Sequence, residues 1–314
     1  MYINKISHYI PKTRVPNLYF SQLSGQDEDW IFQRTGIKTR SKAAKDENTN
    51  TMAIQASKQL SNIVNFPISE VDLIVGATYS PYDTVGTLAH AVQRSLNITN
   101  AKVVSISSAC SSFINALEIV EGYFAMNKAK KAIIVASEHN SIYSNPENPK
   151  DGHLWGDGAV AVLVTKEKIS EKDIHIKDIL TFGLAHEGEG NLGVMLHPKF
   201  EGINMPHGND VYLHAIKYMT ELPKQLLKKN NMSVEDVDYL VPHQANIRII
   251  NKVAKKLKIS KDKIFVNIEE LGNTGCASSP IALSQNINIL KKGDIIMMSV
   301  FGGGYSGGAV ILEA

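Results

Sequence analysis

The sequence predicts an α/β protein that consists of two related halves. The segment Glu70–Val75 recurs 166 residues later as Asp236–Val241, and Cys110–Leu117 recurs at the same offset as Cys276–Leu283. Similarity at a constant spacing is typical of an internal repeat. We therefore expect a duplicated α/β unit.

Both halves show the same alternation of short strands and longer helices. Runs rich in β-branched residues predict strands at Val71–Ala77, Val103–Ser107, Ala132–Ser137, Ala159–Val164, Ile174–Leu180, Tyr239–Pro242, Ile264–Asn267, Ile295–Val300 and Ala309–Glu313. Apolar residues at helical spacing predict helices at Met52–Asn65, Phe113–Met126, Val211–Lys229, Ile247–Leu257 and Pro280–Leu290. The last strand of each half opens with Gly-Ala-Val, at Gly158 and Gly308. Nearly continuous apolar strands indicate sheets that are covered on both faces.

The polar stretches Gln26–Thr51 and Ser141–His153 show neither the helical nor the strand period, and we expect them to be irregular insertions that carry function.

The composition is that of an ordinary globular protein of 314 residues, 43% of them hydrophobic and 20% charged. We divide the chain into residues 1–166 and 167–314, at the charged stretch Lys166–Lys172. A net charge of +2 gives no indication of a nucleic-acid partner. With two cysteines and no apolar leader after Met1, we expect free thiols and a cytoplasmic location. No apolar run approaches the roughly 18 residues of a membrane span.

Cys110 has the sequence setting of a nucleophile. It follows the predicted strand that ends at Ser107 and precedes the predicted helix that begins at Phe113. Its sulfur should then lie near the free N–H groups of the first helical turn, where the helix dipole lowers the pKa of a thiol. A lone cysteine is otherwise explained as a small buried hydrophobic residue. We interpret Cys276, the counterpart in the second half, in that structural way.

Two further residues make Cys110 a candidate catalytic group. His243 ends a strand of the second half at the position where the first half has Ala77, and Asn273 lies in a glycine-containing turn. If a pseudo-twofold axis relates the halves, matching strand ends meet across it, and Cys110, His243 and Asn273 converge. Gly303, in a glycine triplet after a strand, can bring a backbone N–H to a developing oxyanion. No metal-binding or phosphate-loop motif occurs, so we expect no metal and no redox cofactor.

With these residues the chain resembles the β-ketoacyl-acyl carrier protein synthase III family of thiolase-fold condensing enzymes. The motifs that carry the resemblance are Asp29-Trp30-Ile31, Arg34-Thr35-Gly36-Ile37, Ala109-Cys110-Ser111, Val241-Pro242-His243-Gln244-Ala245-Asn246 and Gly272-Asn273-Thr274. The resemblance covers nearly the whole chain. It implies a thiolase-like, five-layered αβαβα fold built from the two duplicated halves. It also implies a homodimer whose subunits complete each other's acyl pockets.

The resemblance implies a role for each matching position. Cys110 would take an acyl group from a thioester, with the N–H groups of Cys110 and Gly303 as the oxyanion hole. His243 and Asn273 would bind the carbonyl of a malonyl-carrier thioester and stabilise the enolate left by decarboxylation. Phe301 matches the aromatic residue beside the site. The positions that match binding residues for pantetheine and the nucleotide of coenzyme A are Trp30, Arg34, Asn246 and Arg248.

Two departures from the family concern substrate choice. Pro149-Lys150 stands where the family often places Arg-Gly against adenine, which argues against tight binding of coenzyme A. Val85 replaces a bulky aromatic residue that caps the acyl pocket from the neighbouring subunit, which predicts room for a longer chain. A specialised relative is therefore the close alternative, such as the ketosynthases that build dialkylresorcinol and related aryl pigments from two fatty thioesters.

A basic cluster begins next to the active-site motif. Arg248, Lys252, Lys255 and Lys256 lie on one predicted helix, and three more lysines follow it. Charge runs are usually solvated faces. The position of this one favours the docking of an acidic acyl carrier protein by electrostatic attraction.

Three other protein classes fit the residues less well. Papain-type hydrolases also use Cys, His and Asn in this order, but in a different local sequence. A non-catalytic ketosynthase partner subunit would lack Cys110. A degradative thiolase would have a second catalytic cysteine where Tyr305-Ser306-Gly307 stands. We therefore predict an acyltransferase that condenses a cysteine-bound acyl group with a malonyl- or β-ketoacyl-carrier thioester, in fatty acid or related polyketide biosynthesis.

Overall fold

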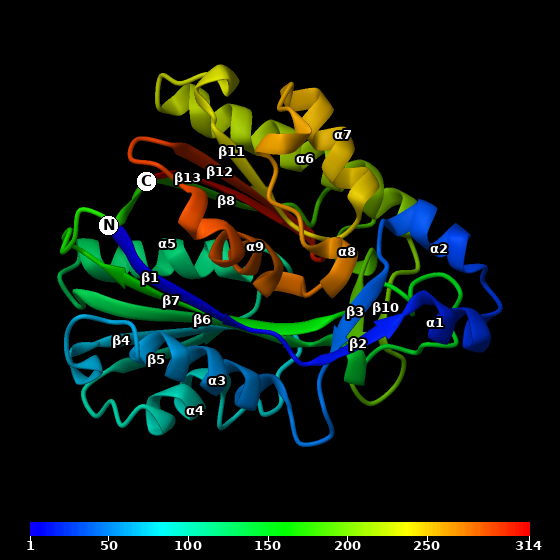
Figure 1. The fold of residues 1–314 in the computed structure, drawn as a ribbon, viewed down its shortest axis with the longest axis horizontal. Helices are drawn as coiled ribbons and strands as arrows, with labels where there is room; N and C mark the ends of the chain where they lie inside the picture. The colour runs from blue at the N-terminus through cyan, green and yellow to red at the C-terminus, as the bar shows by residue number, and fades with distance from the viewer.

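The computed structural model describes residues 1–314 and shows five layers, in the order helix, sheet, helix, sheet, helix (Figure 1). The layers contain, from one face to the other, α6 (Gly208–Lys229) with α7 (Ile247–Leu257), one sheet, α5 (Ser112–Ala125) with α9 (Ser278–Asn286), a second sheet, and α3 (Thr49–Ser61) with α4 (Leu88–Ser95). This is the αβαβα arrangement that the resemblance implies.

Each half of the chain supplies one sheet. The strands of the first half are β1 (Tyr2–Tyr9), β4 (Leu73–Ala77), β5 (Lys102–Ile106), β6 (Lys131–His139) and β7 (Asp157–Thr165). Those of the second half are β8 (Ile174–Gly183), β11 (Tyr239–Pro242), β12 (Ile295–Gly302) and β13 (Ser306–Glu313). The sheets touch only through β1 and β8, which pair Tyr2 with His175 and Ile3 with Ile174. Through this contact the strands form one ladder in the order β11-β12-β13-β8-β1-β7-β6-β4-β5.

The two sheets repeat one topology. In the first half β4 pairs in parallel with β6, and antiparallel β7 and β1 follow. In the second half β11 pairs in parallel with β12, and antiparallel β13 and β8 follow. The inner helices α5 and α9 begin at corresponding positions, each two residues after Cys110 and Cys276. The structure therefore bears out the duplication predicted from the sequence.

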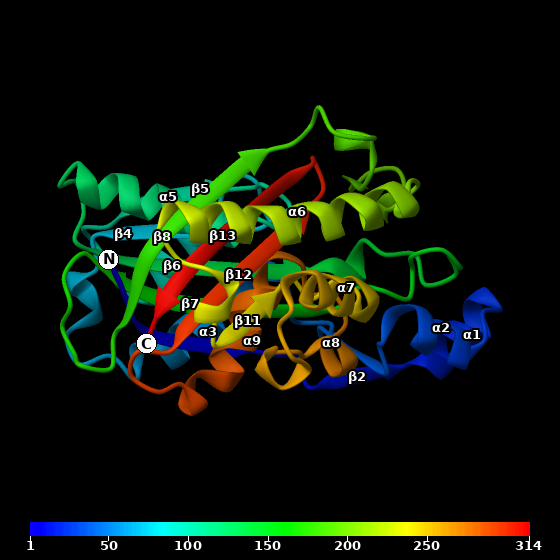
Figure 2. The same ribbon diagram turned by 90° about the horizontal axis from the view of Figure 1, so that it is seen from above.

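Three apolar cores hold the layers together. The largest lies between the sheets, around α5 and α9, and includes Phe113 and Ile281. A second lies beneath α6 and α7, and Figure 2 shows α6 crossing β8, β13 and β12. A third lies beneath α3 and α4. Since each fully buried aliphatic or aromatic side chain contributes roughly 1.5–3 kcal/mol, the inner core fixes one sheet against the other.

Several predicted elements differ from the structure. Ile264–Asn267 is not a strand, because Ile264 makes a single bridge to Leu240 at the place that β5 occupies in the first half. The stretch Gln26–Thr51 is not irregular, since it contains α2 (Glu28–Thr35) and β3 (Thr39–Lys42). The Asp27 side chain starts α2 by accepting the Trp30 N–H at 3.0 Å. The strand β1 was not predicted, since polar residues interrupt its apolar pattern.

The remaining elements are short and lie near the site. They are α1 (Asn17–Ser24), β2 (Thr13–Pro16), which pairs with β3, the hairpin of β9 (Met195–His197) and β10 (Gly202–Asn204), and α8 (Ile268–Leu271). The segment Ser141–His153 carries only a turn of 3-10 helix and no strand, as predicted.

Candidate active site

Cys110, His243 and Asn273 line one cavity of about 120 Å³. Cys110 lies in the turn between β5 and α5, His243 directly after β11, and Asn273 between α8 and α9. The structure thus brings together the three residues that the sequence predicts to converge. A larger hollow of about 710 Å³ lies beside β1 and the C-terminus, but neither cysteine lines it.

The backbone around Cys110 is tightly constrained. Ala109, the residue before it, has a φ of 49°, a conformation that residues with a side chain rarely adopt. Gly302 packs directly against the nucleophile, because a Cβ at this position would lie 2.5 Å from the Cys110 nitrogen. Only glycine allows this approach. Gly303, which we predict as an oxyanion-hole residue, follows it and also lines the cavity.

The structure contradicts the expectation that the helix dipole lowers the pKa of the Cys110 thiol. Burial and the nearby carboxylate of Glu138 raise the pKa of Cys110 to about 12, although the Tyr79 side chain acts in the opposite direction. Glu138 is fully buried at the end of β6, and sequence reasoning missed it. Desolvation and a negative neighbour both disfavour a thiolate. The raised pKa favours the neutral thiol form of Cys110.

His243 is held as a neutral imidazole. Burial lowers the pKa of His243 to about 4. Its Nδ1 lies 2.7 Å from the Ser278 hydroxyl oxygen, which also accepts the backbone N–H of Gln244 at 3.3 Å. The Ser278 hydroxyl can donate its proton to Nδ1, and in that arrangement the imidazole proton lies on Nε2. Nε2 makes no hydrogen bond within the chain and is free to donate.

Asn273 presents a second donor. Its Oδ1 accepts the Gly275 N–H at 3.0 Å, which leaves the Nδ2 group of the amide for the cavity. Its backbone is clamped to the segment before β7, since the Gly156 N–H donates to the Asn273 carbonyl at 3.0 Å and Asn140 Nδ2 donates to the same carbonyl at 3.1 Å. His243 and Asn273 can therefore offer two N–H groups to one oxygen atom.

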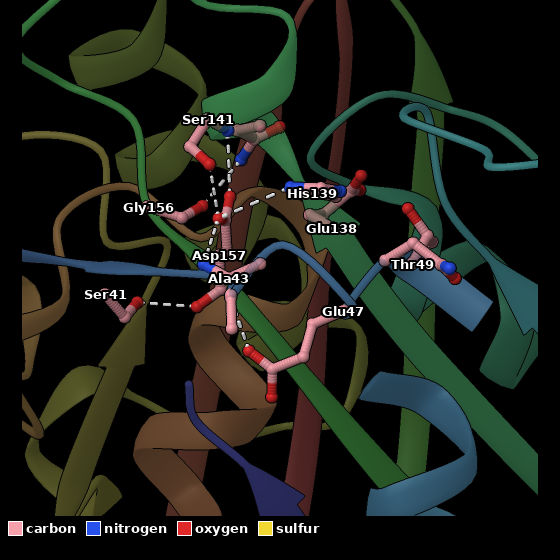
Figure 3. A network of polar contacts seen from close by, with 12 residues as sticks. Ser41, Ala43, Glu47, Thr49, Glu138, His139, Ser141, Gly156 and Asp157 are labelled. Atoms are coloured by element: carbon pink, nitrogen blue, oxygen red, sulfur yellow. Dashed lines mark hydrogen bonds and ion pairs between the residues drawn. The ribbon is translucent and has the colours of Figure 1, made fainter. Parts of the chain in front are cut away.

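A buried polar network supports this clamp (Figure 3). Its centre is the carboxylate of Asp157, the residue after Gly156. It accepts the Ala43 N–H at 2.8 Å, and the N–H and hydroxyl of Ser141 at 2.8 and 2.6 Å. The Ser41 hydroxyl donates to the Asp157 carbonyl at 2.5 Å. These bonds tie β3 and the loop after β6 to β7, and so fix the segment on which Asn273 rests.

The rest of the cavity wall is mainly apolar. Phe301, predicted to lie beside the site, is buried in this wall and packs against Tyr305 in a tilted arrangement, with ring centroids 4.9 Å apart. Sequence reasoning missed the other wall residues, which include Tyr79, Trp155 and the side chains of the β9–β10 hairpin: Val194, Met195, Leu196 and Ile203. The apolar run Val194–Leu196 is the only signal that could have identified the hairpin. Such a wall suits a hydrocarbon chain.

Trp30, Arg34, Asn246 and Arg248 lie where α2 meets α7. The Arg34 guanidinium lies 5.0 Å from the centre of the Trp30 ring. Asn246 caps α7 by accepting the Arg248 N–H at 2.8 Å, and its Nδ2 donates to the Arg34 carbonyl at 3.0 Å. Asn246 therefore ties the two helices together, in addition to any ligand it binds.

The predicted docking residues form an exposed basic face. Arg248, Lys252, Lys255 and Lys256 are all exposed on α7, and none of them makes an ion pair. Lys252 and Lys256 also border a groove between α6 and α7 that Lys224 lines from the other side. Lys224 was not recognised from the sequence, since it belongs to a different helix.

Val85 lies outside the cavity of its own chain. It is 84% exposed, on the loop between β4 and α4. Its predicted role as a pocket cap depends on a neighbouring subunit.

Cys276 is buried, does not line the cavity, and donates its S–H to Glu138 at 2.8 Å. These three observations agree with a structural role for Cys276. None of the helices combines the length and apolarity needed to cross a membrane. No group of three or more His, Cys, Asp or Glu side chains is placed to hold a metal ion.

Comparison with known proteins agrees with the geometry. Residues 104–182 match the family profile "3-Oxoacyl-[acyl-carrier-protein (ACP)] synthase III", and residues 227–314 match the profile of its C-terminal part. The chain is 38% identical to the β-ketoacyl-[acyl-carrier-protein] synthase III of Aquifex aeolicus, over 97% of this chain and 96% of the relative. The corresponding protein of Clostridium perfringens (strain SM101) is 36% identical, with the same coverage.

Solved structures show the same likeness. The crystal structure of 3-oxoacyl-[acyl-carrier-protein] synthase III from Aquifex aeolicus superposes with a TM-score of 0.92 at 36% identity, and covers 100% of this chain and 99% of that one. One conclusion follows from the residues that converge from both halves, the matching fold and the near-complete coverage. The chain belongs to the 3-oxoacyl-[acyl-carrier-protein] synthase III family, within the thiolase fold.

Proposed function

We propose that this protein is a ketosynthase in which Cys110 carries the acyl group and His243 and Asn273 activate the second substrate. The observation that carries this proposal is the single cavity that all three residues line. The comparisons favour a synthase of this kind over an aryl-pigment ketosynthase or a papain-type hydrolase.

In the first half-reaction the Cys110 sulfur attacks a thioester carbonyl. A bond forms between the sulfur and the acyl carbon, the bond to the carrier thiol breaks, and the cysteine proton leaves with that thiol. The oxyanion faces the backbone N–H groups of Cys110 and Gly303. These groups need little reorientation during the reaction, because Gly302 and Ala109 hold the loop rigidly.

In the second half-reaction a malonyl-carrier thioester loses carbon dioxide. The electron pair of the broken C–C bond moves into an enolate, whose oxygen accepts the N–H groups of His243 Nε2 and Asn273 Nδ2. The enolate carbon then attacks the acyl carbonyl, and the Cys110 sulfur leaves as a thiolate, which takes a proton from solvent to restore the thiol. The proposed reaction needs no metal and no redox cofactor, since both substrates arrive as activated thioesters on phosphopantetheine.

The proposed partner for the basic face of α7 is an acidic acyl carrier protein. Arg248, Lys252, Lys255 and Lys256 form no ion pair, and Glu221 is the one acidic residue in the groove that Lys252 and Lys256 border, so most of this positive charge is available to a partner. The same face lies next to Asn246 and Arg34, at the rim where a pantetheine arm would enter. A carrier bound there would stand beside the site.

The proposed assembly is a homodimer. The strand β5 ends the sheet, pairs only with β4, and leaves one row of backbone N–H and C=O groups without strand partners. Free sheet edges favour pairing with another chain. The loop after β4 is also strongly exposed, with Tyr82 at 67% and Val85 at 84%. A second copy that covers this region would place Val85 where it can reach the neighbour's acyl cavity, and sedimentation velocity would reveal the dimer.

The assignment of Cys110 is tested by mass spectrometry. The protein is incubated with hexanoyl thioester and digested, and we expect the adduct on the peptide that contains Cys110. An adduct on Cys276 would overturn the assignment.

The roles of His243 and Asn273 are tested by replacing each with alanine. Both variants should still acquire the acyl group but should not condense, because the oxyanion hole of acylation is backbone. If both lost acylation as completely as Cys110→Ser, the division of roles would be wrong.

A further inference from the structure

Tyr79 has an unexplained polar group in the active-site wall. It lies just beyond the end of β4 and lines the same cavity as Cys110. Its hydroxyl is buried and makes no hydrogen bond of ordinary geometry, although the side chains of Asn140 and Cys110 lie close to it. Since buried polar groups are nearly always hydrogen-bonded, a native hydroxyl without a partner needs an explanation.

The neighbours of Tyr79 fix its side chain in place. Gly275 has a φ of 58°, and a Cβ there would collide with the Tyr79 hydroxyl and lie 2.8 Å from the Glu138 side chain. The Tyr79 backbone N–H donates to Glu138 Oε1 at 3.3 Å. The phenol is therefore held between the turn after Asn273 and the nucleophile, with little room to move away.

The chemistry of Cys110 creates a need for a donor at this position. No lysine or arginine lines the cavity. The titratable groups around the sulfur are Tyr79, Cys276 in the turn before α9, Glu138 on β6, and His243 after β11. Glu138 opposes negative charge on the sulfur, Cys276 is a neutral thiol bonded to Glu138, and the free donor of His243 serves the second substrate. Of these four groups, only Tyr79 lowers the pKa of the Cys110 thiol.

We propose that Tyr79 is a further catalytic residue, whose hydroxyl donates a hydrogen bond to the Cys110 sulfur as negative charge develops on it during acylation. The phenol keeps its proton throughout. The cysteine proton still leaves with the carrier thiol, and the bonds made and broken are those of the first half-reaction. This inference rests on the proposed function, since it takes Cys110 as the acylated residue.

The test compares Tyr79→Phe with Tyr143→Phe. Tyr143 is a matched control, because its hydroxyl donates to the Pro81 carbonyl at 3.1 Å and it does not line the cavity. Iodoacetamide reports the thiolate fraction of Cys110. We expect Tyr79→Phe to slow alkylation at pH 8 by about tenfold or more, as the loss of a hydrogen bond to a charged group implies. Self-acylation from hexanoyl thioester should slow similarly, and the control should match wild type in both assays.

Two further measurements separate this role from others. Condensation by enzyme that is already acylated should keep its wild-type rate. The melting temperature of Tyr79→Phe should equal or exceed that of wild type, because the change removes a buried hydroxyl that has no partner.

Unchanged alkylation would overturn the proposal. An effect on KM alone would assign Tyr79 to substrate binding instead, and a lower melting temperature with unchanged alkylation would make its role structural. If the acyl group mapped to a residue other than Cys110 while Tyr79→Phe still slowed alkylation, the proposed function would fail and the hydrogen bond would stand.

Discussion

Replacing Ser278 with alanine should slow condensation and leave self-acylation unchanged. The Ser278 hydroxyl lies 2.7 Å from His243 Nδ1 and is the only group that hydrogen-bonds this ring. Ser278 is 1% exposed, so water cannot easily take the place of the hydroxyl. Without it, nothing keeps the imidazole proton on Nε2, where the enolate oxygen needs it.

The magnitude follows from the hydrogen bond that is lost. A buried acceptor left without its donor costs about 1–3 kcal/mol. One factor of ten in rate corresponds to about 1.4 kcal/mol, so condensation should slow by about 5- to 150-fold. The rate is measured in a single turnover, by adding malonyl-carrier thioester to enzyme that already carries the acyl group. This order of addition isolates the second half-reaction.

Ser279→Ala is the matched control. Ser279 is the next residue of α9, is also 1% exposed, and has a hydroxyl without a hydrogen-bond partner. Its removal should leave both half-reactions at the wild-type rate and should not lower the melting temperature. Wild-type condensation by Ser278→Ala, or an equal loss in both variants, would refute the assignment of the Nε2 proton.

Three further predictions concern docking, chain length and pH. The double change Lys255→Glu and Lys256→Glu should raise KM for a carrier-linked donor far more than for a small thioester. The same double change at the exposed pair Lys128 and Lys130 should not have this effect. Equal effects of the first variant on both donors would mean that the face is merely solvated. Val85→Phe should lower kcat/KM for decanoyl thioester about tenfold to a hundredfold and spare acetyl, since overpacking costs about 1–3 kcal/mol, and a wild type confined to acetyl would contradict this. Burial lowers the pKa of His243 to about 4, below its usual 6.5. Between these two pH values the unfolded chain therefore binds more protons than the folded chain, so stability is lost as the pH falls from 6.5 towards 4. His243→Gln should therefore remove about 2 kcal/mol from the difference in unfolding free energy between pH 7.5 and pH 5, measured in urea, and an unchanged difference would show that His243 is not held neutral.

The sequence could predict the convergence of the site because that convergence depends on topology. A repeat at constant offset places His243 at a strand end that corresponds to Ala77, and strand ends of related halves meet. Cys110 was recognised in the same way. The strands β4, β6, β7, β12 and β13 were recognisable because burial on both faces makes them continuously apolar.

The electrostatics of the site could not be predicted in this way. The position of Cys110 before a helix indicates a lowered thiol pKa, but Glu138 approaches it from β6, a separate strand. Tyr79 and Trp155 belong to loops whose course is set by packing, so local sequence pattern carried no signal of their place in the wall. The failure of Ile264 to start a strand has the same origin, since its partner strand β11 offers it a single bridge.

The duplication also explains why only one of the two corresponding cysteines lies in a cavity with side-chain donors. Cys276 stands in the second half where Cys110 stands in the first, and its sulfur faces the Ala77 carbonyl at 3.5 Å, across the axis that places His243 in the same cavity as Cys110. Alanine supplies no donor for a substrate. Glu138 also accepts the Cys276 S–H, and burial keeps that thiol neutral. The same carboxylate that disfavours a thiolate at Cys110 therefore also keeps its counterpart protonated, and only the cavity of Cys110 combines a free thiol with two side-chain donors.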